Sequence, residues 1–217
     1  MKERPILLNA EMVRAVLDGR KTQTRRMVAN VDSDNCLALR KPTKTRNGIY
    51  THVMDAPKHN LCPFGAVGDR LWVRETWQGP LVSYDDAYSI FKDPKPYQKV
   101  ENCVYRADGG PCPEFTDADD ELRQGWRPSI HMPRWASRIT LEITGVRVER
   151  LQDISDSDAK AEGCWYGRGC GEPDFAVSPA DHFPTLWASI YREKSWQANP
   201  WVWVIEFKRL DNADKAG

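Results

Sequence analysis

The sequence lacks any apolar run of the roughly 20 residues that a membrane-spanning helix needs. Its N-terminal residues also lack the long apolar stretch and the cleavage site of a secretory signal peptide. These absences predict a cytoplasmic protein with no membrane partner. There is no net charge, because 31 Lys and Arg balance 31 Asp and Glu. A global electrostatic attraction to nucleic acid is therefore not expected.

Regular metal-binding and repeat patterns are absent as well. The six cysteines include no Cys-x-x-Cys pair, and the spacing of Cys164 and Cys170 is loose for a zinc site. Free thiols are therefore expected, with no metal and no other cofactor. No stretch repeats, and no alternating strand-helix rhythm indicates a doubly wound fold.

What the sequence does contain is a short amphipathic helix followed by a basic segment. Residues 10–18 carry apolar residues at helical spacing, with Asn9 as a predicted N-cap and Gly19 as the stop. Four cations follow between Arg20 and Arg26. From Arg14 to Arg46, nine Lys or Arg face three Asp, so a one-sided basic surface is compatible with the neutral total. The segment is either a solvated connection or a site for a polar ligand.

The remaining pattern predicts a mixed α+β domain over residues 1–210, built on a small, mostly antiparallel, barrel-like sheet. The spacing predicts short helices over 155–162 and from Phe183 to Tyr191. Irregular insertions are expected at 28–66, with a short hairpin near Asn47 and Gly48, and at 79–137 and 164–182, followed by a polar tail at 211–217. The predicted strands cover 70–77, 103–106, 139–144, 146–151 and 201–210, and the third and fourth are either adjacent or one bent strand.

Two further features are candidates for binding. In the strand over 70–77, Glu75 follows the apolar face of Val73, either as a strand-end residue or as an inward-pointing carboxylate. The segment from Trp126 to Trp135 combines two prolines with Arg127, His131 and Arg134. A rigid, cationic, aromatic loop can hold a base or a phosphate, although a packed connector explains the same residues.

At this point the residues resemble a known family, the ASCH domains. The resemblance rests on the Gly19–Arg26 motif after the first helix, on Gly68–Val73 as a strand, on the paired strands that lead to the Glu162 helix, and on Trp203–Phe207. The segment from Trp126 to Trp135 resembles the large ASCH proteins of phages and prophages. The resemblance implies a PUA-like barrel and the cytoplasm of a bacterial host cell.

One bacterial branch of that family removes the acetyl group from N(4)-acetylcytidine with a lysine, a threonine and a glutamate. Lys21 and Thr24 match the lysine and threonine of its Gly-Arg-Lys-Thr-x-Thr motif, and Glu162 matches the glutamate. The resemblance therefore implies that these three residues are catalytic and that the partner is a modified nucleoside. Related ASCH proteins are proposed to bind or cut RNA, so RNA or another single-stranded nucleic acid is the alternative partner.

The chemistry of the three residues suits amide hydrolysis, which needs a nucleophile, a base and an acid for the leaving amine. Thr24 offers a hydroxyl, Lys21 can accept its proton if the lysine pKa is lowered, and Glu162 can protonate the amine. The simpler interpretations are a surface cation, a β-forming residue and a helix-end carboxylate. In the alternative function, a nucleic-acid-binding module, the same cleft binds phosphate and a base through arginines: Arg20, Arg25, Arg26, Arg127 and Arg134. A nuclease would use similar residues, with His131 as a candidate proton shuttle. The predicted substrate-binding residues are Arg20, Arg25, Arg26, Glu75, Trp77, Arg127, His131 and Arg134, with Trp135 as a further stacking candidate.

Overall fold

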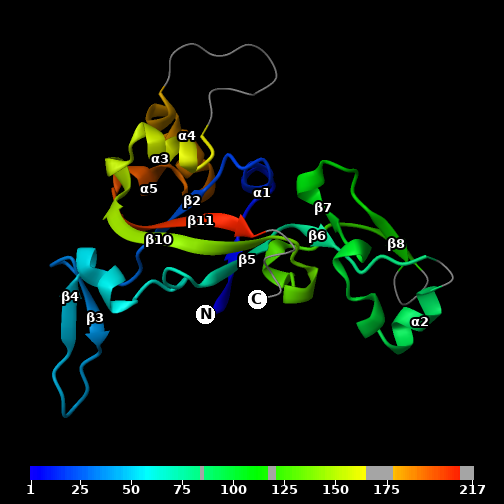
Figure 1. The fold of residues 1–217 in the computed structure, drawn as a ribbon, viewed down its shortest axis with the longest axis horizontal. Helices are drawn as coiled ribbons and strands as arrows, with labels where there is room; N and C mark the ends of the chain where they lie inside the picture. Colours follow the sequence, from blue (N-terminus) through cyan, green and yellow to red (C-terminus); the bar gives the residue numbers. More distant parts are fainter. Residues whose placement is uncertain (84–85, 117–120, 165–177, 211–217) are drawn as a thin grey trace. The chain divides into compact units, whose positions relative to one another are not determined.

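A computed structural model of the chain describes residues 1–83, 86–116, 121–164 and 178–210. These residues form a mixed α+β fold, as predicted (Figure 1). The main sheet has five strands in the order β1-β5-β10-β11-β2, and three two-stranded sheets accompany it. Because β1 and β2 end that order, the described residues contain no closed barrel. None of the described helices is long and apolar enough to cross a membrane.

The chain separates into two compact units. The first comprises residues 1–2, 18–70 and 142–208, and the second comprises residues 3–17, 71–141 and 209–217, of which 211–217 lie outside the described part. Strand β10 (Thr140–Arg150) begins in the second unit and continues in the first.

The first unit is built on the antiparallel pair of β2 (Gln23–Met27) and β11 (Trp201–Leu210), in which Thr24 lies opposite Ile205. Three helices cover one face of these strands in Figure 1: α3 (Asp156–Ala161), α4 (Pro179–Tyr191) and α5 (Glu193–Gln197). Their apolar side chains join the strands in one core, made of Leu151, Ile154, Ala159, Cys164, Phe183, Trp187, Val202 and Val204. The unit also holds η8 (Leu151–Asp153) and a ribbon of β3 (Cys36–Arg40) and β4 (Ile49–His52), followed by η1 (Val53–His59).

The second unit contains β1 (Glu3–Leu7), α1 (Ala10–Leu17) and β5 (Arg70–Arg74). Asn9 caps α1, since its Oδ1 accepts a hydrogen bond from the Met12 amide at 2.8 Å. The rest consists of short elements: β6 (Trp77–Gln78), α2 (Ala87–Lys92), η3 (Lys95–Tyr97), η4 (Val100–Asn102), β7 (Val104–Tyr105), η5 (Arg106–Asp108), β8 (Glu114–Thr116), β9 (Leu122–Gln124), η6 (Ser129–His131) and η7 (Arg134–Ala136). A separate core joins Trp77, Tyr105, Met132 and Ala136.

Several boundaries differ from the sequence prediction. The predicted strand over 70–77 is interrupted after Arg74, and the stretches over 139–144 and 146–151 form the single strand β10. Helix α4 begins at Pro179 rather than near Phe183, because the Ser178 hydroxyl accepts a hydrogen bond from the Asp181 amide and supplies an N-cap. The prediction of a loop over 164–182 was therefore wrong for residues 179–182, which are helical. Residues 165–177 and the tail over 211–217 lie outside the described residues.

Candidate functional site

The basic motif enters β2 between the end of α3 and strand β11. The Thr22 amide donates to the Ala161 carbonyl at 2.8 Å, and the Thr22 carbonyl accepts from the Phe207 amide at 2.8 Å. Gly19, with a φ of +74°, adopts the left-handed conformation that ends the preceding helix. These main-chain bonds place the Lys21 side chain beside the C-terminal end of α3.

Lys21 and Glu162 form a buried ion pair there. The Lys21 Nζ donates to Glu162 Oε2 at 2.6 Å and to the Glu162 carbonyl oxygen at 2.9 Å. Glu162 caps the C-terminus of α3, where a lysine ammonium also satisfies a free helix carbonyl. The side chain of Lys21 is 0% exposed and that of Glu162 is 4% exposed, so solvent screens their interaction little.

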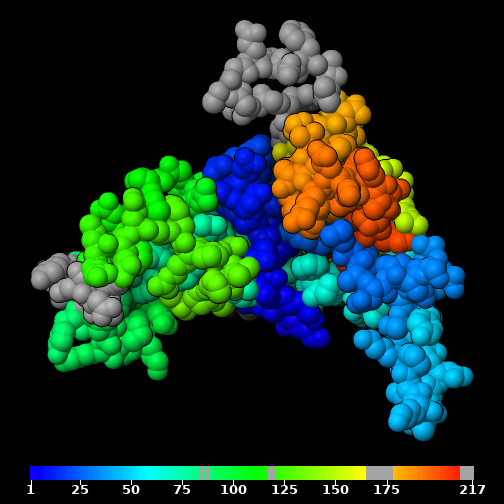
Figure 2. Space-filling view, turned by 180° about the vertical axis from the view of Figure 1, so that it is seen from behind, coloured from blue at the N-terminus to red at the C-terminus, as the bar shows by residue number. Residues whose placement is uncertain are grey.

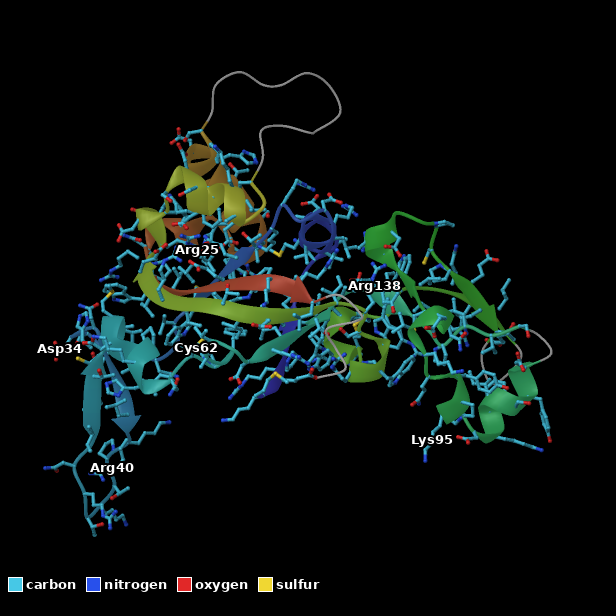
Figure 3. All side chains as sticks on the ribbon, in the orientation of Figure 1. Arg25, Asp34, Arg40, Cys62, Lys95 and Arg138 are labelled. Atoms are coloured by element: carbon cyan, nitrogen blue, oxygen red, sulfur yellow. The ribbon has the colours of Figure 1, made fainter. Side chains whose placement is uncertain are left out.

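Arg25 connects this pair to a larger ionic cluster (Figure 3). Its guanidinium lies 3.3 Å from Glu162 Oε1 and 3.2 Å from Asp158 Oδ2, and it also pairs with Glu149. The Cζ atom of the guanidinium lies 5.7 Å from the centre of the Phe183 ring. Arg25 thus contacts three carboxylates and an aromatic ring from a fully buried position.

Arg147 on β10 completes the ionic cluster. It lies 3.1 Å from Glu149 Oε2 and 2.8 Å from Asp158 Oδ1, and it also pairs with Glu206. Asp158 and Glu149 are therefore each shared between two arginines. Since the buried Glu162 and the half-buried Glu149 and Asp158 each have cationic partners, the cluster avoids the large cost of an unpaired buried charge.

The ionic cluster shifts the pKa values of its members. Burial lowers the pKa of the Lys21 amine, although Glu162 opposes this and Arg26 adds to the lowering. The pKa of Asp158 is lowered overall. Burial acts to raise it, but the positive charges of Arg147 and Arg25 together lower it by more. Burial and the charge of Glu162 raise the pKa of the nearby Cys164 thiol to about 12, so this cysteine is a neutral thiol at pH 7.

The structure places Thr24 on the other face of β2. Neighbouring side chains on a strand point to opposite faces, and Arg25 contacts Glu162 while Thr24 Oγ1 accepts a hydrogen bond from Arg26 at 2.8 Å. Thr24 is fully buried. Arg20 is partly exposed and pairs with Asp18 at 2.9 Å. The structure therefore brings Lys21, Arg25 and Glu162 into contact, whereas Thr24 and Arg26 form a separate pair.

Glu75 belongs to the second unit, where it is a buried carboxylate directly after the end of β5. Arg138 donates to both of its oxygens at 3.0 Å. The same guanidinium lies 2.8 Å from Asp108 Oδ1 and 4.0 Å from the centre of the Tyr105 ring. Burial raises the pKa of Glu75, and Arg138 opposes that shift. Both carboxylate oxygens are therefore engaged by the protein itself.

The aromatic and cationic residues of the second unit have protein partners too. The Trp77 ring is buried and contacts Trp135 edge to face at 5.6 Å, while the exposed Arg127 guanidinium lies 5.5 Å from the Trp77 ring centre. Arg134 pairs with Glu3 at 3.0 Å, and His131 is exposed on η6. Trp77 is thus part of the core of the second unit.

Six residues of the ionic clusters around Arg25 and around Arg138 were missed as site residues from the sequence: Asp108, Arg138, Arg147, Glu149, Glu206 and Asp158. Asp158 belongs to the capping pattern that begins at Ser155, and that pattern predicts only a local role for it. Arg147 and Glu149 share one face of β10 by their spacing of two, and that is the one signal of their pairing. Among the described residues, no group of three or more His, Cys, Asp or Glu could hold a metal ion.

Comparison of the chain with protein-family models, with curated proteins and with solved structures finds no match.

Proposed function

We propose that this chain is an amidohydrolase of the ASCH type, with a PUA-like sheet, that removes the acyl group from an N(4)-acylated cytidine. The observation that carries the proposal is the buried contact of 2.6 Å between Lys21 Nζ and Glu162 Oε2. These two residues come from positions 141 apart in the chain. They are also two of the three that match the catalytic set of N(4)-acetylcytidine amidohydrolases.

The buried pair suits amide hydrolysis because the proton that Lys21 and Glu162 share can lie on either residue. As an ion pair, Lys21 is an ammonium and Glu162 a carboxylate. Transfer of the proton along the 2.6 Å contact gives a neutral amine, which is a base, and a neutral carboxylic acid. Burial favours the neutral amine of Lys21 and lowers its pKa. Lys21 then accepts a proton from the nucleophile while Glu162 donates one to the leaving amine.

The resemblance makes Thr24 Oγ1 the nucleophile. In this reaction the Thr24 oxygen bonds to the acyl carbon, its proton moves to Lys21, and the C–N bond breaks as Glu162 protonates the cytosine amine. Water then releases the acid. The hydrogen bond from Arg26 to Thr24 Oγ1 supports the role, because a guanidinium stabilises a developing alkoxide.

The placement of Thr24 on the opposite face of β2 from Arg25 favours a second route. Here a water activated by Lys21 attacks the acyl carbon directly, and Glu162 again protonates the amine. Thr24→Ala separates the two routes. Loss of all turnover supports attack by Thr24, whereas retained turnover with loss in Lys21→Met supports attack by water.

The alternative function, in which the arginines bind the phosphates of nucleic acid, receives less support from the geometry. Arg25 is buried against three carboxylates, while Arg20 and Arg134 pair with Asp18 and Glu3. Arginines engaged in this way would have to leave an acidic partner before binding phosphate. A neutral nucleoside makes no such demand.

The experiment is to incubate the purified protein with N(4)-acetylcytidine and separate cytidine and acetate by chromatography, at low and at high salt. Lys21→Met and Glu162→Gln remove one partner each. The exposed pair of Lys58 and Asp55, at 2.7 Å, supplies the matched controls Lys58→Met and Asp55→Asn. Cytidine release that is lost in the first two variants alone, and is insensitive to salt, supports the proposal.

A further inference from the structure

A local excess of positive charge lies on the ribbon of β3 and β4. Residues 35–54 contain four Lys or Arg and no Asp or Glu, although the whole chain is neutral. The four cations are exposed and lie together at or beside the connection between the two strands: Arg40, Lys41, Lys44 and Arg46. The salt bridges of the described residues involve none of them.

The base of the ribbon is fixed to the core of the first unit. Asn35 Oδ1 accepts hydrogen bonds from Trp201 Nε1 at 2.8 Å and from Arg150 at 3.2 Å. At the other side of the base, Val53 is fully buried and its amide donates to the Asn35 carbonyl at 2.8 Å. The ribbon therefore has an anchored end.

The far end of the ribbon differs from this base. Strand pairing runs from Cys36 opposite His52 to Arg40 opposite Ile49, and Thr43 and Arg46 form one further bridge in the connection. Figure 3 shows Arg40 well along the ribbon from Asp34, and Figure 2 shows the ribbon as a narrow projection beyond the helices of its unit. The cations thus gather on a thin, ordered projection.

From these observations we infer that the β3–β4 ribbon binds the phosphate backbone of nucleic acid. Two paired strands lie about 4.8 Å apart, and such a ribbon fits the major groove of duplex DNA, which is about 12 Å wide. Four cations without a nearby carboxylate match a regularly spaced polyanion. The exposed ring of Tyr50, next to this end, can stack on an unpaired base.

This inference does not depend on the proposed hydrolysis, because the ribbon shares no residue with the Lys21–Glu162 site. A single nucleoside offers no backbone to bind, so the ribbon would act on a polynucleotide. Failure of either proposal leaves the other standing.

The test is a fluorescence-anisotropy titration of the full chain with a 20-base-pair DNA duplex and with a 20-nucleotide RNA strand, at 50 to 200 mM salt. With four phosphate contacts, affinity should fall by about 100-fold for the duplex over that range, and by about 50-fold for the single strand. The variant R40A/K41A/K44A/R46A should weaken binding more than tenfold and flatten the salt dependence. The stronger of the two probes identifies the form of nucleic acid that the ribbon prefers.

The matched control is K92A/K95A/K99A/R106A, which removes four exposed cations from the second unit. Unchanged binding by this control supports the ribbon as the binding surface. Equal loss in both variants, or no loss in the ribbon variant, overturns the inference. Binding of the ribbon to anionic phospholipid vesicles but to neither nucleic acid also overturns it. An unchanged circular dichroism melt shows that each variant is folded.

Discussion

Glu162 lies between two cations, with Lys21 2.6 Å from its Oε2 and Arg25 3.3 Å from its Oε1. The two partners are unequal. Arg25 also contacts Glu149 and Asp158, whereas Glu162 is the one carboxylate among the described residues that pairs with Lys21. Loss of Glu162 therefore leaves Lys21 as a buried amine without a counterion, and loss of Lys21 leaves Glu162 with Arg25.

This asymmetry predicts unequal effects on stability. Glu162→Gln should lower the free energy of unfolding by about 3–5 kcal/mol, the usual cost of an uncompensated buried charge, and Lys21→Met should lower it by less. The double variant Lys21→Met/Glu162→Leu should be more stable than Glu162→Leu alone. Urea unfolding followed by circular dichroism measures all four. Additive effects would contradict the coupling of the two residues.

The lowered pKa of Asp158 predicts that its contribution to the free energy of unfolding depends on pH. Its folded pKa is below the ordinary value of 3.8 for an aspartate, so its ionised form contributes stability above that pH, and the contribution is lost as the pH falls through the folded pKa. Asp158→Asn should therefore cost about 1.5–3 kcal/mol at pH 7 and progressively less below pH 3.8. Urea unfolding at pH 7, 5, 4 and 3 measures the difference. A cost that stays constant with pH would mean that the charge of Asp158 plays no part.

The lowered pKa of Lys21 predicts the alkaline limb of the reaction. The active form of the pair holds one proton, which is lost when the pH exceeds the lysine pKa. Because burial places that value below 10.5, kcat/KM should decline before pH 10.5 is reached. A profile measured from pH 6 to 10.5, with substrate stability checked at each pH, tests this. A plateau that extends to pH 10.5 would contradict the proton-sharing pair.

In the second unit, Glu75 and Asp108 provide a matched comparison, since both pair with Arg138. Glu75→Ala removes a buried carboxylate that makes two contacts of 3.0 Å, and it should cost about 3–5 kcal/mol. The side chain of Asp108 is 51% exposed, so Asp108→Ala should cost less than about 1 kcal/mol. Thermal unfolding of both variants gives the comparison. Equal costs would show that burial does not decide the strength of these pairs.

The sequence predicted the elements whose pattern is local. The Ser155 pattern predicted α3 with Glu162 at its end, and the alternation of Leu71 and Val73 extended correctly to a buried Glu75. Asn9 and Gly19 marked the ends of the first helical segment because capping depends on neighbours within a few residues.

Local sequence patterns could not predict the tertiary partners of the buried charges. Arg25 is one of several arginines in a basic motif, and its burial depends on Asp158 and Glu149, more than 120 positions away. Arg138 is likewise 63 positions from Glu75. No local pattern marks a partner at that separation. The strands β8 and β9 of the second unit were missed because three residues are too few to show a period, whereas β7 lies within the predicted strand over 103–106.

The most direct test of the account is the rate of cytidine release from N(4)-acetylcytidine at pH 7, compared between the native chain, Lys21→Met and Glu162→Gln under conditions in which all three are folded. The account predicts a measurable kcat/KM for the native chain that falls by about 100- to 10,000-fold in each variant, the usual worth of a general acid or base. No turnover by the native chain, or turnover that survives both substitutions, would contradict it and leave the Lys21–Glu162 pair a structural contact.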